Sequence, residues 1–179
     1  MPQLADTAAP TRQLSPDADA LDRFRRRMTH PLLMRLFMLF KLPLGLFSGM
    51  RLAAIDAGRC QVVIRYGWRN TNPFRSMYFA AQSMAAELST GALAMLATQT
   101  SPRSVAMLIT GLEASFGKKA TGRVTFTCED GAEMFAAVGE TLATGEPVVV
   151  RAETVGRMED GAEVSRFVFT WSFKRRSTP

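Results

Sequence analysis

The sequence contains very few of the residues that bind metal ions or form disulfides. Only two cysteines and one histidine occur among its 179 residues. Cys60 and Cys128 fall inside strand-like runs, and His30 stands alone, so the chain has neither a disulfide framework nor a set of zinc ligands. We therefore expect a protein without a metal site, in a reducing, cytoplasmic setting.

The motifs that hold nucleotides or activate a serine are also missing. The sequence contains neither GxGxxG nor GxxxxGKS, whose glycines bring the backbone close to phosphates. A Ser-His-Asp set would have to be built around His30 alone. These absences argue against nucleotide hydrolysis and serine chemistry, and no cofactor is expected.

Negative charge is scarce near the start of the chain. Between Leu21 and Arg51 there are seven arginines and lysines against Asp22 alone, which accounts for the whole net charge of +6. The rest of the chain is close to neutral, so the sequence does not predict a uniformly basic surface for nucleic acid.

The sequence also lacks an uninterrupted hydrophobic run long enough to cross a membrane. In "HPLLMRLFMLFKLPLGLFSGM", residues 30–50, the charges of Arg35 and Lys41 and the ring of Pro43 divide the apolar residues. The same charges weaken a signal-peptide interpretation, and no small-residue cleavage site follows. The third alternative is an amphipathic helix from Pro31 to about Lys41 that packs on the domain or lies on an anionic membrane surface. We favour packing, which would make the protein soluble without detergent.

The chain has the length of one domain with an N-terminal extension. Residues 1–20 are rich in proline, alanine and aspartate and predict a disordered leader. Residues 21–48 form the amphipathic helical segment, and residues 49–175 form a single domain.

Alternation of apolar and polar residues predicts six strands. Turn signals at Ala57-Gly58 and Asp160-Gly161 indicate two hairpins. A long helix occupies most of residues 76–99, and a shorter helix is expected at about 131–143. The strands are expected at 51–56, 60–66, 105–116, 122–128, 147–155 and 163–174. This order predicts an α+β fold in which the sheet wraps around the long helix.

Glu87 is the only charged residue between Ser76 and Gln99. On a helical wheel its nearest neighbours are Ala80, Met84, Gly91 and Ala94, mostly small residues that leave room for another group to approach. A buried carboxylate is costly unless it is paired or protonated. Glu87 is therefore either a functional acid with a raised pKa that faces a pocket, or a structural residue that pairs with an arginine across the sheet or caps a neighbouring chain.

Three stretches resemble a known family: "KLPLGLFSGMRL", "NTNPFRSMYFAAQSMAAE" and "EASFGKKATGRVTF". They are similar to the hotdog-fold thioesterases, in particular to a poorly characterised bacterial branch grouped with the acyl-CoA thioesterases of the phenylacetyl-CoA type. The resemblance covers roughly Lys41 to Lys174. It implies a hotdog fold, an acyl-CoA or acyl carrier protein thioester as substrate, and a homodimer or tetramer with sites at the dimer interface.

The resemblance also implies roles for individual residues. Catalytic relatives carry an asparagine, then a His-Gly-Gly turn, then an acid, and these places fall on Asn72, Tyr78-Phe79-Ala80 and Glu87. Glu87 would be the general base or nucleophile, Asn72 would position the carbonyl or the water, and a backbone N–H near Phe79 would stabilise the oxyanion. Further residues expected to contact the substrate are Ser83, Met84, Lys118 and Lys119.

Several of these positions have a second interpretation. Phe79 replaces a glycine that would let the backbone approach the substrate closely. Asn72 precedes Pro73 and could simply open a turn, and Lys118 and Lys119 could belong to a solvated turn instead of binding coenzyme A phosphates. Two hypotheses result: a thioesterase that uses Glu87, or a non-catalytic acyl- or lipid-binding protein whose N-terminal helix touches a membrane.

Overall fold

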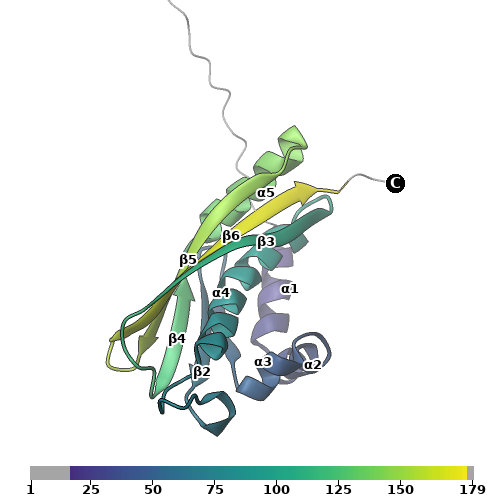
Figure 1. Ribbon diagram of the computed structural model, residues 1–179. Helices are drawn as coiled ribbons and strands as arrows, with labels where there is room; N and C mark the ends of the chain where they lie inside the picture. The colour runs from purple at the N-terminus through teal and green to yellow at the C-terminus, as the bar shows by residue number, and fades with distance from the viewer. Residues whose placement is uncertain (1–16, 177–179) are drawn as a thin grey trace, which may run out of the picture.

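A six-stranded antiparallel sheet forms the body of the protein (Figure 1). The structure is a computed structural model and describes residues 17–176. The strands lie in the order β1-β2-β4-β5-β6-β3. Their bounds are β1 Arg51–Ile55, β2 Cys60–Arg65, β3 Val105–Phe116, β4 Arg123–Cys128, β5 Val148–Met158 and β6 Glu163–Arg175. The predicted number of strands and both predicted hairpins, β1-β2 and β5-β6, are confirmed.

Helix α4, Phe79–Gln99, packs against one face of this sheet, which curves around it (Figure 1). Thirteen of its 21 residues are buried, because apolar and small residues occur on every side of the helix. The sheet contributes a row of aromatic side chains from β6 to the same core, of which Phe167 and Phe173 are fully buried. The α+β hotdog architecture expected from the sequence is therefore present.

Strand β3 has a different partner from the one that chain order suggests. It follows α4 and precedes β4, but it pairs with β6 over eleven register positions and lies at the opposite side of β5 and β6 from β4. The chain therefore crosses over between Phe116 and Arg123 instead of closing a hairpin. As a result β3 is an edge strand, and the loop that leaves it passes beside the start of α4, where Met77 N–H donates to Ala120 O at 2.8 Å.

Helix α5, Gly131–Thr144, packs beside α4 and confirms the predicted short helix. It ends at Gly145, whose φ of +83° places it in the left-handed region that favours glycine. Thr141 closes this end of the helix, because its hydroxyl donates to Glu146 O and accepts from Arg175 N–H.

The N-terminal segment forms three helices where the sequence predicted one. Helix α2, Pro31–Lys41, has the expected bounds, and α1, Ala18–Thr29, and α3, Pro43–Ser48, lie before and after it. Proline at the first position of α2 and α3 explains the breaks, since proline starts a helix but cannot continue one. Residues 1–16 of the expected leader lie outside the described residues, and Ala18 already belongs to α1. No described helix has the length and apolar character needed to span a bilayer.

Candidate functional site

The segment before α4 is a tight loop organised by Asn72. The Asn72 side-chain oxygen accepts hydrogen bonds from Phe74 N–H at 2.9 Å and Ser76 N–H at 3.2 Å. This is the turn-opening arrangement that Asn-Pro favours. The loop is held to the crossover segment by Lys119, whose ammonium donates to Phe74 O at 3.1 Å. The catalytic role of Asn72 stays a prediction, and its oxygen already has a structural task.

A cavity of about 530 Å³ lies between this loop and the crossover segment. Five of the predicted site residues line it together: Asn72, Tyr78, Phe79, Lys118 and Lys119. They are close because the crossover brings residues 117–120 back over the start of α4, more than 35 residues later in the sequence. The cavity therefore has apolar walls and cations at one side. These features suit an acyl group that is attached to an anionic carrier.

The N-terminus of α4 points its free amides toward this cavity. The helix has no side-chain cap, and the first N–H groups with intrahelical partners are those of Ala81 and Gln82, which both donate to Tyr78 O. The N–H groups of Phe79 and Ala80 lie at the positive end of a 21-residue helix and remain available to an oxygen. An exposed Phe79 ring, packed edge-on against Tyr78 and Phe116, lies beside them at the position where the resemblance predicts a glycine.

Glu87 lies two turns further along α4 and has no ionic partner. Within residues 17–176, no hydrogen bond or salt bridge reaches its carboxylate, so the predicted pairing with an arginine across the sheet is wrong within one chain, and the predicted contact with a neighbouring chain stays a prediction. Its Oε1 lies over Gly91: a Cβ at Gly91 would sit 2.9 Å from Oε1 and 3.3 Å from the Trp171 ring. Burial raises the pKa of Glu87 above its ordinary value.

The other polar residues of α4 contrast with Glu87. Gln82, Ser89 and Thr90 are all buried. Each bonds to a residue of the sheet: Gln82 to Ser165 at 2.8 Å, Ser89 to Thr154 at 2.8 Å, and Thr90 to the Trp171 indole N–H at 3.1 Å. The helix therefore satisfies its neutral polar groups and leaves its one carboxylate without a donor, which marks Glu87 as the exception.

The predicted site residues form two groups within one chain. Ala80, Ser83, Met84 and Glu87 share a partly exposed stripe of α4, separate from the lining of the cavity near Asn72. Glu87 lies eight residues beyond Phe79, which is about 12 Å along a helix axis. The Ser83 hydroxyl is turned back onto Phe79 O at 3.0 Å. A single chain therefore does not bring Glu87 to the helix N-terminus.

The two cysteines are poor nucleophiles. They face each other across β2 and β4 and are fully buried. Burial raises the pKa of the Cys128 thiol to about 12 and raises that of Cys60 as well. Thiolate chemistry is therefore disfavoured, in agreement with the sequence analysis, which gave the cysteines no catalytic role.

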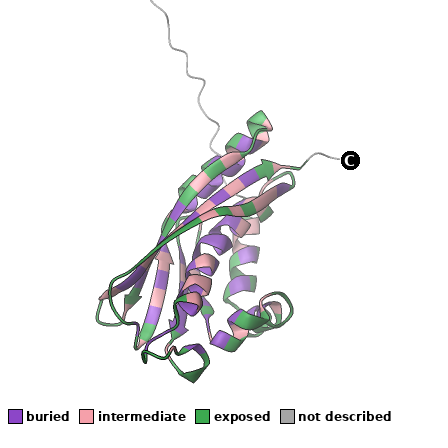
Figure 2. Ribbon diagram, viewed as in Figure 1, coloured by how far each residue is buried: buried purple, intermediate pink, exposed green. Residues whose placement is uncertain are grey.

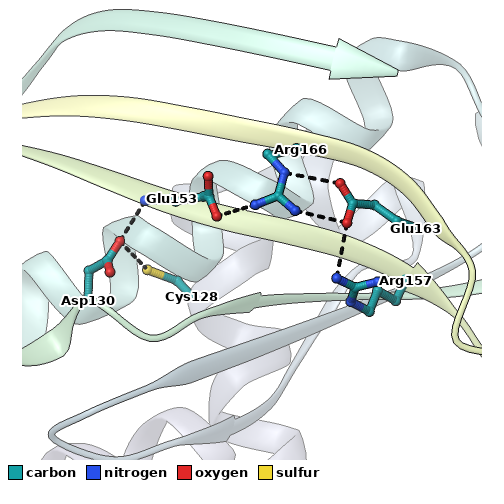
Figure 3. A network of polar contacts seen from close by, with 6 residues as sticks. All are labelled: Cys128, Asp130, Glu153, Arg157, Glu163 and Arg166. Carbon is teal, nitrogen blue, oxygen red and sulfur yellow. Dashed lines mark hydrogen bonds and ion pairs between the residues drawn. The ribbon is translucent and has the colours of Figure 1, made fainter. Parts of the chain in front are cut away.

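Sequence reasoning missed two polar groupings. Asn70 is buried and donates to Ser48 O and Arg65 O, so it ties the 3₁₀ turn Trp68–Asn70 to the N-terminal helices. On the outer part of β5 and β6, Arg166 bridges Glu153 and Glu163, and Glu163 also pairs with Arg157 (Figure 3). Arg166 meets Glu153 through the register of β5 with β6, whereas both pairs of Glu163 lie close to the hairpin turn.

Asp130, which is drawn in Figure 3, shows how a hydrogen-bond donor changes the pKa of a partly buried carboxylate. Asp130 accepts Glu153 N–H at 2.6 Å, and the Cys128 thiol lies 3.9 Å away. Burial raises the pKa of Asp130, but the hydrogen bond from Glu153 N–H opposes that effect. For Glu87 desolvation is the only cause of the shift. Glu87 is thus the stronger candidate for a general base.

The raised pKa of Glu87 predicts a pH-dependent loss of stability. Below the ordinary glutamate pKa both the folded and the unfolded chain hold the proton, and the group costs nothing. As the pH rises toward the raised pKa, only the unfolded chain releases its proton, so the free energy of unfolding falls. Glu87→Gln should lack this fall. Urea unfolding between pH 4 and 8 should show the variant gaining stability over wild type as the pH rises, and parallel pH profiles would contradict the expectation.

These features define a hotdog fold: an antiparallel sheet wraps around a long helix, a cavity lies at the N-terminus of that helix, and the unpaired acid Glu87 lies further along it. A family model described as a domain of unknown function, DUF4442, matches residues 32–173, and the chain belongs to that family. No curated protein of similar sequence was found.

Solved structures show the same fold at low sequence identity. A Pseudomonas aeruginosa protein described as a probable thioesterase aligns with a TM-score of 0.68 and 21% identity, over 84% of this chain and 99% of its own. A Chlorobaculum tepidum protein of unknown function gives a TM-score of 0.68 and 14% identity, over 83% and 99%. A Haemophilus influenzae thioesterase gives 0.57 and 12%, over 78% and 88%.

Proposed function

We propose that the protein hydrolyses an acyl thioester of coenzyme A or acyl carrier protein, with Glu87 as general base. The observation that carries the proposal is the partly buried, unpaired carboxylate of Glu87 in a helix whose other polar groups are satisfied. Because burial raises its pKa, the ionised form of this group is a stronger base than an ordinary carboxylate and can accept a proton from water. The fold of the solved relatives supports the same reaction class.

In the proposed hydrolysis, Glu87 acts as the base and the N-terminus of α4 stabilises the oxyanion. Glu87 takes a proton from water, and the resulting hydroxide attacks the thioester carbonyl to form a tetrahedral oxyanion. The free N–H groups at the start of α4 stabilise that oxygen, because they carry partial positive charge. Collapse breaks the carbon–sulfur bond, and Glu87 returns the proton to the leaving thiolate. The products are a carboxylic acid and a thiol.

The separation of Glu87 from the helix N-terminus is resolved if two chains share each site. In a homodimer, the stripe of α4 that carries Glu87 in one chain would face the cavity beside Asn72 of its partner. The edge strand β3 supports this assembly, since a partner chain would bury its exposed Leu108 and Leu112. Lys118 then stands at the mouth of the cavity, where coenzyme A phosphates would meet a positive charge.

The direct test is a hydrolysis screen over acyl-CoA chain lengths, with released thiol as the readout. A preference for one chain length, with turnover above the uncatalysed rate, would support the proposal. The alternative is a non-catalytic acyl- or lipid-binding protein, favoured by Phe79 in the place of a glycine. Tight acyl-CoA binding without thiol release at any length would support that alternative and reject hydrolysis.

A further inference from the structure

The outward side of α2 is apolar. Most of α2 is exposed (Figure 2). Five of its exposed residues are large and apolar: Leu32, Leu33, Leu36, Leu39 and Phe40, of which Phe40 is 76% exposed. Only Met34 and Met38 of this helix are buried. The helix therefore packs on the domain along one narrow line and presents most of its surface outward, which is unusual for a helix that faces only water.

The apolar surface continues onto neighbouring elements. In α3, Leu44 and Phe47 are exposed, and the Phe47 ring meets the Trp68 ring edge-on with centroids 5.9 Å apart. Trp68 belongs to the 3₁₀ turn before Asn72 and is 78% exposed. We call the surface made by α2, α3 and Trp68 the N-terminal face.

The charge around the N-terminal face has one sign. Between Asp22 and Glu87 the chain contains eleven arginines and lysines and a single acid, Asp56. Four of these cations, Arg35, Lys41, Arg51 and Arg69, lie in or beside α2, α3 and the 3₁₀ turn and are exposed. Among the described residues none of the four forms a salt bridge, whereas Asp22 pairs with Arg25 and Arg26 further back. The apolar surface is thus bordered by unneutralised positive charge.

A cavity of about 760 Å³ opens on the same face. Buried methionines such as Met34, Met38 and Met50 form its interior, and the exposed Leu39 and Phe47 belong to its lining. Arg35, Arg51 and Arg69 also line it, and no acidic residue of the described range 17–176 does. Flexible methionine side chains adapt to a variety of apolar groups. Like the N-terminal face around it, the cavity has apolar and cationic side chains. It therefore suits a molecule with an apolar part and an anionic part.

We propose that the N-terminal face binds the surface of an anionic lipid membrane. Leucines and aromatic rings enter the boundary between headgroups and acyl chains, while the bordering cations meet lipid phosphates. Helix α2 has eleven residues, about 16 Å, so it lies in the interface and does not cross the roughly 30 Å hydrocarbon core. The proposal stands on residues other than Glu87 and Asn72, so it does not depend on thioester hydrolysis.

Charge favours a membrane over the other occupants of such a face. A second copy of this chain would bring the four cations against their own counterparts, and like charges repel. Nucleic acid would match the cations but would leave the leucines of α2 exposed to water. An anionic bilayer matches both the apolar surface and the charge.

Tryptophan fluorescence can report on this interaction. Of its two tryptophans, Trp68 is exposed on the N-terminal face and Trp171 is 3% exposed in the core. Adding phosphatidylglycerol-containing vesicles to the full-length protein should shift the emission of Trp68 to shorter wavelength, and the protein should co-sediment with the vesicles. Phosphatidylcholine vesicles should give weaker binding, and about 0.5 M salt should weaken binding to the anionic vesicles.

Matched variants separate the apolar and the charged contributions. Phe40→Ser should lower vesicle binding by roughly tenfold or more, because an exposed ring no longer enters the lipid. The pair Arg35→Gln and Lys41→Gln should lower it by roughly 25-fold, at about fivefold for each cation near an anionic surface. Val149→Gln serves as the control, since Val149 is 57% exposed on β5, away from the N-terminal face.

Three results would overturn the proposal. The first is no co-sedimentation of folded wild-type protein with anionic vesicles. The second is equal binding to neutral vesicles, which would remove the role of the cations. The third is that Phe40→Ser dissociates an oligomer in light scattering without changing vesicle binding, which would assign the face to a contact between copies of this chain. Unchanged melting temperatures would show that the variants are folded.

Discussion

Replacing Glu87 with glutamine is expected to reduce thioester hydrolysis by roughly 10²–10⁴-fold, the usual loss when a general base is removed. Glutamine keeps the shape of the side chain and cannot accept a proton from water. The loss should appear in kcat, since the carboxylate acts on the water and not on the acyl group. Acyl-CoA binding, measured by calorimetry, should change little.

The same substitution should not harm folding, because Glu87 has no partner to lose within the described residues. A buried salt bridge broken by substitution destabilises strongly, whereas removing an unpaired, partly buried charge relieves a desolvation cost. We therefore expect Glu87→Gln to melt at the same temperature as wild type or higher at neutral pH. Glu140→Gln, an exposed carboxylate on α5, is the matched control and should leave both activity and stability unchanged. Full hydrolysis by a folded Glu87→Gln protein would rule out the catalytic role.

The sequence predicted those parts of the fold that depend on neighbouring residues. The predicted strand from Val105 to Phe116 has its observed bounds, and Pro31 and Lys41 bounded α2 correctly. These features follow from local rules of strand alternation and helix ends. The partner of β3 did not follow from such rules. Its pairing with β6 depends on which edges remain open once the two hairpins have formed, and this is a property of the whole chain.

The candidate site likewise has features that the sequence predicted and features that it did not. The spacing of Glu87 in a helix of small residues predicted an accessible carboxylate, and Gly91 does lie beside it. The absence of an ionic partner could not be predicted, because any arginine brought near by the sheet would have supplied one. The meeting of Asn72 with Lys118 and Lys119 at one cavity depends on the crossover after β3, which no local pattern specifies.

The exposed surface of the N-terminal segment was also hidden from the sequence. The pattern of residues 31–41 allowed either packing on the domain or contact with a membrane surface. In the structure α2 packs through Met34 and Met38 and still exposes Leu36 and Phe40, so one helix serves the first purpose and remains free for the second. The two alternatives are therefore compatible.

Placing lysine at both Leu108 and Leu112 on β3 is expected to convert the proposed homodimer into folded monomers. The two leucines are 66% and 52% exposed on an edge strand whose outer side has no strand partner among the described residues. Two chains would bury four such leucines, and at about 1.5 kcal/mol each the change removes about 6 kcal/mol, or roughly a 10⁴-fold weakening of the dimer. Repulsion between the new cations adds to this loss. Light scattering should report half the wild-type mass.

Hydrolysis should fall together with the dimer, because Glu87 of one chain would no longer reach the cavity beside Asn72 of the other. We expect the double lysine variant to be about as inactive as Glu87→Gln, while its circular dichroism stays native, since β3 keeps its pairing with β6. Val149→Lys is the control: it places a lysine at an exposed apolar position of β5, which lies inside the sheet and not at its edge. It should remain dimeric and active. A wild-type protein that is monomeric and active, or a monomeric lysine variant with full turnover, would show that one chain holds a complete site. The base would then have to be sought among the residues around the cavity itself.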